Sequence, residues 1–270
     1  MVSSAEARSF RATVEYDGTA YFGFQRQRRG PNRVGVSIQE ELEEALGRLA
    51  GHPVRVTGAG RTDTGVHALG QVIGFTIEWP HRRGDAALLR ALNATLPPDI
   101  ALSTLAEAPP GFHPRFDARR RTYEYRVLNA PVRRPLLRQR AWHVVVTLDE
   151  AQMNAAAMLL VGTRDFATFG RPPVGDNTAR TVYSAAWRRE GEVLVFRVGA
   201  NAFLHRMVRS LVGSLRKVGD GSWSVDDFAA ALVAGDRQRS ASAAPAHGLY
   251  LVSVEYDTSD ELRVTRYSDE

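Results

Sequence analysis

Apolar residues follow two spacings in the first hundred residues of the chain: every second residue in some segments, and every third or fourth residue in others. Residues 10–16 alternate apolar and polar side chains, which predicts a strand with one buried face. Residues 38–49 place apolar side chains at helical spacing, which predicts an amphipathic helix. Ser37 and Glu40 form a capping box at its start, and Gly51 is suited to end it. We therefore expect a strand followed by a helix.

The same patterns continue to about residue 105. Further strands are predicted at residues 54–57, 71–77 and 100–105, and a helix capped by Asp85 is predicted before the last of them. The element order is then β-α-β-β-α-β. This is the split βαβ arrangement of ferredoxin-like and RNA-recognition folds.

A second unit is expected after residue 108. Pro109, Pro110 and Gly111 interrupt regular structure, so we place a boundary between domains 1–108 and 109–270. The predicted elements beyond it are strands at 122–128, 141–146, 182–187, 193–198 and 249–256, a helix capped by Thr147, and helices at 202–218 and 224–234. The predicted fold class is α+β, with two ferredoxin-like or RNA-recognition-like subdomains built from mostly antiparallel sheets and flanking helices.

Composition narrows the class of protein. The 270 residues include no cysteine, which excludes disulfides, thiolate nucleophiles and cysteine-bound metals and fits a reducing cytoplasm. Hydrophobic residues make up 44% and charged residues 24%, as in soluble globular proteins, and no apolar run is long enough to span a membrane. The first residues contain no secretory signal pattern. The net charge is +5, and Lys217 is the single lysine beside 34 arginines, a composition that permits a nucleic-acid partner.

Arginine is densest between residues 115 and 140. Nine arginines stand there against Asp117 and Glu124, and Tyr123 and Tyr125 lie within the run. Cations beside aromatic rings suit phosphates and unstacked bases. The alternatives are a solvated charged surface for the arginines and a core position for the two tyrosines.

The segment 58–72, GAGRTDTGVHALGQV, joins two predicted strands and resembles a phosphate-binding loop. It fits neither G-x-G-x-x-G, because Asp63 occupies the third glycine position, nor the P-loop, which requires Lys and Ser or Thr after its second glycine. The loop therefore presents an acid. From spacing alone, Asp63 is better interpreted as closing an Asx-turn, and His67 as a structural histidine rather than a metal ligand, because no second ligand stands at suitable spacing.

Together these residues resemble the tRNA pseudouridine synthase A family. The loop around Asp63 is similar to its AGRTD-x-GVHA signature, and further similar stretches follow in order: RRRTYEYRV, the Arg180-Thr181 segment, and ANAFLHRMVRSLVGSL, which ends at Leu215. Both ends of the chain, VEYDGTAYFGFQRQ and AHGLYLVSVEY, also resemble the family. The resemblance covers nearly the whole chain, although the segment 171–177 has no clear counterpart.

The resemblance implies an active site in a cleft between the two domains. Asp63 would be the catalytic carboxylate, Arg209 its partner, and Tyr123 the ring that stacks on the target base and handles its C5 proton. No cofactor, nucleotide or metal would be required.

The resemblance also implies a partner. The substrate would be tRNA, modified at uridines 38, 39 and 40 of the anticodon stem loop by a cytoplasmic homodimer. The residues expected to bind substrate or RNA are Arg26, Arg28, Arg61, Thr62, His67, Arg115, Arg119, Arg120, Arg121, Arg180, Asn201 and His205.

Three alternatives remain. A noncatalytic RNA-binding module could use the same fold and arginines, and a pseudouridine synthase could act on another RNA. A nucleotide-binding enzyme would use the glycines of residues 58–65, and it should be protected against heat by ATP or NAD.

Overall fold

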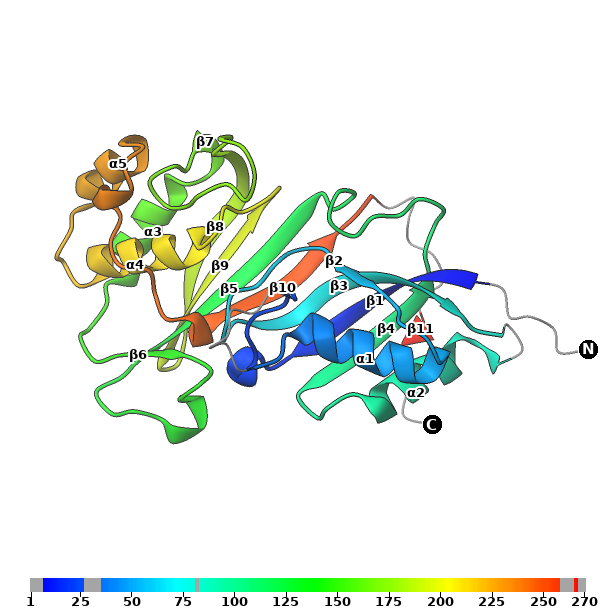
Figure 1. Ribbon diagram of the computed structural model, residues 1–270. Coiled ribbons are helices and arrows are strands. Elements are labelled where there is room, and N and C mark those ends of the chain that lie inside the picture. The colour runs from blue at the N-terminus through cyan, green and yellow to red at the C-terminus, as the bar shows by residue number, and fades with distance from the viewer. Residues whose placement is uncertain (1–6, 27–34, 81–82, 258–264, 267–270) are drawn as a thin grey trace, which may run out of the picture. The chain divides into compact units, whose positions relative to one another are not determined.

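The computed structural model describes residues 7–26, 35–80, 83–257 and 265–266 (Figure 1). The chain divides into two compact units. Unit 1 comprises Met1–Arg119 and Leu251–Glu270, and unit 2 comprises Arg120–Tyr250.

This division differs from the boundary expected after residue 108. Contacts within unit 1 explain the difference, because residues 255 and 256 bind the segment that precedes unit 2. The Arg119 N–H donates to the Glu255 carbonyl at 2.8 Å, and the Tyr256 hydroxyl donates to the Pro114 carbonyl at 2.7 Å. The closing strand β10 (Leu249–Glu255) therefore starts in unit 2 and continues into unit 1.

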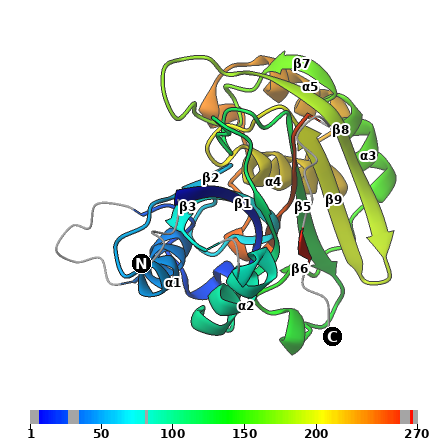
Figure 2. The ribbon, with the colours of Figure 1, turned by 90° about the vertical axis from the view of Figure 1, so that its right-hand side faces the viewer.

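Unit 1 contains β1 (Ala7–Tyr16), α1 (Ile38–Ala50), β2 (Val56–Gly58), β3 (His67–Glu78), α2 (Asp85–Thr95), β4 (Ile100–Glu107) and the short β11 (Thr265–Arg266). Its strands lie in the order β11-β4-β1-β3-β2, with antiparallel pairing throughout. The predicted order of strands and helices in this part of the chain is confirmed. Figure 2 shows α1 and α2 on the same side of β1 and β3.

Local signals account for the ends of α1 but not for the start of α2. The capping box of Ser37 and Glu40 is present, and Gly51 ends α1 in the left-handed conformation at φ 77°. The expectation that Asp85 caps α2 is wrong, because Gly84 occupies the cap position without a side-chain hydrogen bond. The Asp85 carboxylate instead lies 3.0 Å from Nη1 of the buried Arg8.

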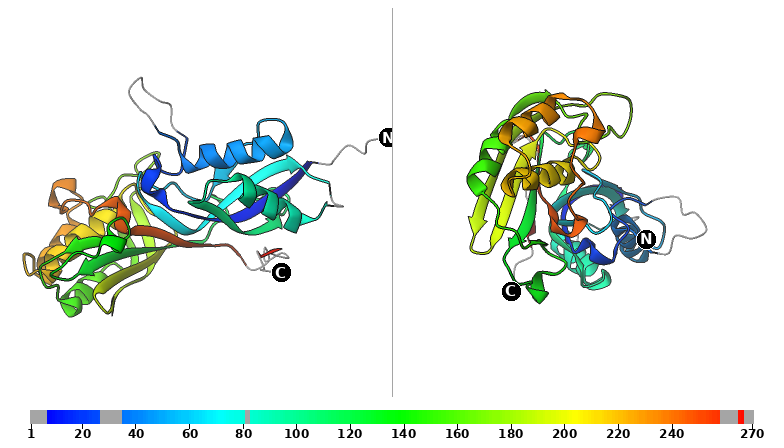
Figure 3. Two further views of the ribbon diagram at one scale, coloured as in Figure 1. Left: turned by 90° about the horizontal axis from the view of Figure 1, so that it is seen from below. Right: turned by 90° about the vertical axis from the view of Figure 1, so that its left-hand side faces the viewer.

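Unit 2 contains β5 (Arg120–Asn129), β6 (Trp142–Val144), α3 (Glu150–Met158), β7 (Gly162–Asp165), β8 (Ala179–Glu190), β9 (Val193–Ala200), α4 (Met207–Gly219) and α5 (Val225–Val233). The order β5-β9-β8-β7 is antiparallel, and β6 runs parallel to β5. The predicted hairpin of β8 and β9 is confirmed, with Gly191 in its turn at φ 61°. Helix α4 packs against α3 and α5, and Figure 3 shows α4 and α5 side by side in both of its views.

Two helix starts in unit 2 differ from the sequence prediction. Asp149, not Thr147, caps α3, and its carboxylate accepts the Gln152 N–H at 3.0 Å. Helix α4 begins at Met207 rather than at residue 202, because Arg206 adopts a left-handed backbone at φ 62°. The apolar spacing before residue 207 therefore belongs to an irregular segment.

Two absences hold within the described ranges. No helix there is long and apolar enough to cross a bilayer. No group of three or more His, Asp or Glu side chains is arranged there to hold a metal ion.

Candidate active site

The loop between β2 and β3 in unit 1 carries Asp63 on a tight turn. The Val66 N–H donates to the Asp63 carbonyl at 3.1 Å, and Gly65 supplies the positive φ of 78° that the turn requires. The Asp63 side chain is half-buried. Strand β3 starts directly afterwards at His67.

Two glycines outside the loop allow the chain to approach it closely. A Cβ on Gly18, in the 3-10 turn η1 (Gly18–Ala20), would lie 2.0 Å from the Val66 carbonyl oxygen. A Cβ on Gly23, at φ 74°, would lie 2.5 Å from the Thr62 carbonyl oxygen. That same carbonyl accepts the Phe24 N–H at 3.1 Å. The segment after β1 thus holds both sides of the Asp63 turn through backbone contacts.

Buried side chains add two further hydrogen bonds to the loop. The Tyr16 and Thr62 hydroxyls lie 2.8 Å apart. The Gln71 amide Nε2 donates to the Gly60 carbonyl at 2.8 Å. Thr62 was expected to bind substrate, but its burial fits positioning of the loop more directly than contact with RNA.

His67 holds the base of the loop. Its ring is 2% exposed, and Nδ1 lies 3.1 Å from the Gly18 N–H and 3.0 Å from Asp17 Oδ1. Both contacts lie directly after β1, at the start of the 3-10 turn η1. His67 therefore joins the loop to the end of β1.

In unit 2, Arg209 on α4 is held by the segment before β10. Its Nε donates to the Ala244 carbonyl at 2.7 Å, and the Ala244 N–H donates to the Arg209 carbonyl at 2.9 Å. One turn later, a Cβ on Gly213 would lie 2.0 Å from the Ser242 carbonyl oxygen, so the segment packs directly on the helix. The Arg209 guanidinium is thus oriented by a neighbouring backbone.

Tyr123 lies on β5 with 8% of its surface exposed. Its ring meets Phe203 edge-on, with centroids 5.0 Å apart and an interplanar angle of 84°. The next residue on the same face, Tyr125, is fully buried and donates from its hydroxyl to the Pro245 carbonyl at 2.8 Å. Burial raises the pKa of Tyr125, against the opposing effect of the Arg209 charge. Tyr125 therefore remains a neutral hydrogen-bond donor at physiological pH.

Two of the residues expected to bind RNA, Arg121 and Asn201, contact each other before α4, and a third, Arg180, adjoins the residue that Asn201 binds. The Arg121 Nη1 donates to the Asn201 carbonyl at 2.8 Å, and Asn201 Oδ1 accepts the Thr181 N–H at 3.0 Å. The neighbouring Arg180 donates to the Ala179 carbonyl at 2.6 Å, and burial lowers its pKa. These contacts tie the ends of β5 and β8 to the segment that leads to Arg209.

The other expected RNA-binding residues are more dispersed. Arg61, Arg115, Arg119 and His205 are exposed, whereas Arg28 lies outside the described residues. Arg61 contacts the Gln25 side-chain oxygen through Nε. The His205 N–H pairs with the Arg171 carbonyl at 2.9 Å.

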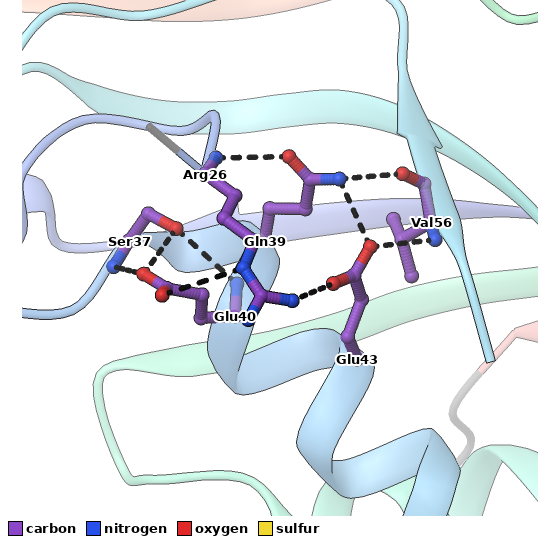
Figure 4. A network of polar contacts seen from close by, with 6 residues as sticks. All are labelled: Arg26, Ser37, Gln39, Glu40, Glu43 and Val56. Carbon is purple, nitrogen blue, oxygen red and sulfur yellow. Dashed lines mark hydrogen bonds and ion pairs between the residues drawn. The ribbon is translucent and has the colours of Figure 1, made fainter. Parts of the chain in front are cut away.

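Arg26 belongs to a polar network at the start of α1 (Figure 4). Its guanidinium lies 3.7 Å from Glu40 and 3.5 Å from Glu43, and its backbone N–H donates to Gln39 at 2.9 Å. Gln39 and Glu43 in turn bind the backbone of Val56. Two carboxylates already balance the charge of Arg26, which weakens its attraction for phosphate.

The run from Arg115 to Arg140 does not form one surface. Side chains alternate along β5, so Arg120 and Arg121 lie on opposite faces. Arg120 donates to the Ser184 hydroxyl at 2.8 Å and crosses the backbone of Gly199, where a Cβ would lie 2.6 Å from its Nε. Further along, Arg134 pairs with Glu192 at 2.6 Å.

Comparison with known proteins identifies the family. The family model described as tRNA pseudouridine synthase matches residues 12–117 and 156–257. This chain belongs to the tRNA pseudouridine synthase family. It is an isomerase that converts uridine to pseudouridine in tRNA. The two matched segments contain Asp63 and Arg209 respectively, whereas Tyr123 lies between them.

Proteins named tRNA pseudouridine synthase A are similar over most of the chain. The protein of Aeromonas hydrophila is 44% identical over 244 residues, covering 90% of this chain and 88% of its own. Those of Rhodospirillum rubrum and Sinorhizobium fredii are 43% and 42% identical, each covering 92% of this chain and 87% and 99% of their own. Among solved structures, the archaeal box H/ACA sRNP Nop10-Cbf5 complex aligns with a TM-score of 0.34 at 13% identity, over 77% of this chain and 44% of that one, which is too distant to support an argument.

Sequence reasoning missed the residues that hold the enzyme's two candidate catalytic groups. Gly18 and Gly23 have no Cβ and so allow the backbone of the Asp63 loop to lie close to them, and the Ala244 carbonyl accepts a hydrogen bond from Arg209. The glycines stand in the segment DGTAYFGF, whose two isolated glycines among aromatic residues were the available signal. Nothing in the residue type of Ala244 indicates its role.

Proposed function

We propose that Asp63 is the carboxylate that acts on the target uridine, that Arg209 pairs with it, and that Tyr123 stacks on the base. The observation that carries the proposal is the Asp63 turn, which Gly18 and Gly23 hold through backbone contacts within a loop of the family's signature. A carboxylate on a fixed turn is suited to chemistry that depends on position.

The reaction requires little beyond one positioned group. The C1′–N1 bond of uridine breaks, the base turns, and C5 joins C1′ while its proton leaves. An ionised carboxylate can add to the substrate or remove a proton from it. A guanidinium beside Asp63 would favour its ionised form. Because the Arg209 Nε is already bound to Ala244, its terminal nitrogens are directed by that contact.

We further propose two ferredoxin-like subdomains with the active site between them. A stacked base hides its reacting atoms, so the uridine would be turned out of the helix to reach Asp63. The nearly buried Tyr123, whose ring is fixed by Phe203, would supply an aromatic surface for it.

The proposed substrate is the anticodon stem loop of tRNA, at uridines 38, 39 and 40, bound by a cytoplasmic homodimer. The exposed arginines Arg61, Arg115 and Arg119 would contact its phosphates. This choice of site is carried over from the resemblance of the sequence to the family.

The test replaces Asp63 by Asn in the full-length protein. Pseudouridine in unmodified tRNA, mapped by carbodiimide labelling, should fall at least about a thousandfold, since the amide can neither act as a base nor carry charge. Affinity for tRNA and Tm should remain near wild type. Asp176→Asn, in an exposed loop of unit 2, is the matched control and should keep full activity.

Retained turnover in Asp63→Asn would remove that residue from the catalytic role. If the wild type binds tRNA and forms no pseudouridine, the noncatalytic RNA-binding function is correct instead. Label at uridines outside 38, 39 and 40 would contradict the proposed substrate site. A Tyr123→Phe variant separates stacking from proton handling, because it keeps the ring and loses the hydroxyl.

A further inference from the structure

Three arginines gather at one corner of unit 2, and none belongs to the arginine-rich run or to the expected RNA-binding residues. Arg171 follows a close contact between two segments, in which a Cβ on Gly170 would lie 2.3 Å from Leu204 Cβ. Arg206 immediately precedes α4. Arg237 starts the 3-10 turn η4 (Arg237–Arg239). Sequence separations of 35 and 31 residues between them conceal this cluster.

Hydrogen bonds to backbone carbonyls hold the three segments together. The His205 N–H donates to the Arg171 carbonyl at 2.9 Å in an antiparallel bridge. The Arg237 Nη1 donates to the Thr168 carbonyl at 2.9 Å, three residues before Arg171. Arg171 and Arg206 are exposed, and Arg237 is half-buried. The arrangement belongs to the fold of unit 2 rather than to a loop tip.

The cluster has no compensating acid among the residues described. No carboxylate there pairs with Arg171, Arg206 or Arg237. Burial lowers the pKa of Arg237, and the charges of Arg171 and Arg206 lower it further. Asp236 precedes Arg237 in the chain, but its carboxylate accepts the Gln238 N–H at 2.9 Å. Three like charges close together destabilise the free protein and favour a bound anion.

The backbone conformation of Arg206 is a second feature that destabilises the free protein. Among described non-glycine residues, it alone has a positive φ, at 62°. A left-handed conformation is unfavourable for a residue with a Cβ, and such positions recur at functional sites. The Arg206 side chain makes no capping hydrogen bond at the start of α4. Glycine would fit this backbone conformation better.

We propose that Arg171, Arg206 and Arg237 form a binding site for the phosphate backbone of the RNA substrate. Guanidinium groups fork onto phosphate oxygens and remain charged. This proposal depends on the proposed function in one respect, the choice of tRNA as the RNA that is bound. The site would increase the affinity for RNA and help to position it, and it would take no part in the reaction. Contacts to the phosphate backbone position a nucleic acid without reading its sequence.

The main test measures binding of unmodified tRNA to the double variant Arg171→Gln/Arg237→Gln as a function of salt. Affinity at moderate salt should fall at least tenfold, and the slope of log K against log salt should decrease by about 2, roughly one per lost phosphate contact. Arg90→Gln, on the exposed face of α2, removes one charge without a described partner and should change neither value by a comparable amount.

A second variant separates binding from folding. Arg206→Gly should keep or raise Tm, because glycine accepts a positive φ, and should still weaken tRNA binding severalfold. Arg171→Gln alone changes an exposed side chain and should weaken binding with an unchanged Tm.

Each outcome is decisive. Wild-type affinity and salt slope in the double variant would overturn the proposed phosphate site, while pseudouridine formation by the wild type would leave the proposed function standing. A wild type that binds tRNA through this site but forms no pseudouridine would refute the function and retain the site. If inorganic phosphate stabilises the wild type more than the double variant, and tRNA affinity is equal for both, the site takes a small anion and the RNA assignment is wrong.

Discussion

The candidate acid in unit 1 and the candidate arginine in unit 2 are held in different ways. The Asp63 turn is fixed mainly by the backbone, through the close approach of Gly18 and Gly23 and the Phe24 to Thr62 hydrogen bond. The segment that orients Arg209 packs on α4 through its backbone at Gly213, and it is held in addition by two side chains, because Arg209 and Tyr125 donate to the carbonyls of the consecutive residues 244 and 245.

This difference predicts different sensitivities to mutation. A backbone contact is lost only when the chain is forced apart, so unit 1 should be vulnerable at its glycines. A side-chain contact can be removed by deleting one hydroxyl, so unit 2 should be vulnerable at single polar groups. The following variants test the comparison.

The largest effect is expected for Gly23→Ala. Its Cβ would lie 2.5 Å from the Thr62 carbonyl oxygen, and φ 74° is unfavourable for alanine, so we expect a loss of about 2–4 kcal/mol in the free energy of unfolding. Displacement of Asp63 should reduce pseudouridine formation about a hundredfold. Gly60→Ala in the same loop is the control, because a Cβ there meets nothing within 4 Å. Equal tolerance of both changes would contradict backbone control of the loop.

A pair of tyrosine variants should give a smaller effect. Tyr125→Phe leaves the Pro245 carbonyl without its donor and should cost about 1–2 kcal/mol by denaturant unfolding, with a severalfold lower kcat. Tyr16→Phe removes one hydrogen bond to Thr62 at a comparable cost in stability. Its kcat should stay near wild type because the backbone contacts of the loop remain. Equal losses of kcat would show that both units depend on side chains alike.

The pH dependence of stability offers a finer measurement in unit 2. Burial lowers the pKa of His247 from its usual 6.5; a hydrogen bond with the Ala141 backbone opposes this, and the Arg209 charge adds to it. Below about pH 6.5 the unfolded chain therefore takes up a proton at His247 that the folded protein excludes. The free energy of unfolding should then decrease as the pH is lowered. His247→Gln should reduce the fall between pH 7 and 5.5, measured by urea unfolding. His52→Gln, at an exposed position, should leave it unchanged.

The smallest effect on stability is expected for Arg119→Gln. The Arg119–Asp257 pair at 2.8 Å has side chains that are 68% and 58% exposed, so its loss should change the free energy of unfolding by about 0.5 kcal/mol or less. Affinity for tRNA should fall nonetheless if Arg119 contacts phosphate. A variant that is destabilised but binds tRNA normally would assign Arg119 to the structure of unit 1.

Local chemistry in the sequence predicted much of the fold. The capping box at Ser37 and the turn at Gly191 depend on neighbouring residues, and both are found. The start of α4 could not be predicted in this way. Phe203 and Leu204 continue the helical spacing, but contacts of the preceding segment with β8 and the left-handed Arg206 keep them out of the helix.

The candidate site was predictable where it forms a contiguous motif. The loop around Asp63 and the segment around Arg209 each stand together in the sequence, so their residue types and spacing can be compared with a family. Their supports come from elsewhere, at Gly18, Gly23 and Ala244. The Arg171 cluster escaped notice for the same reason, because no local pattern brings its three members together.

The placement of β10 has a consequence for biosynthesis. Unit 1 is interrupted by the whole of unit 2 and regains its last strand only from Leu251 onward. On the ribosome, the residues that bind Arg119 and Pro114 emerge after unit 2 has been made in full. Unit 1 therefore cannot complete its contacts to Arg119 and Pro114 until the whole of unit 2 has been synthesised.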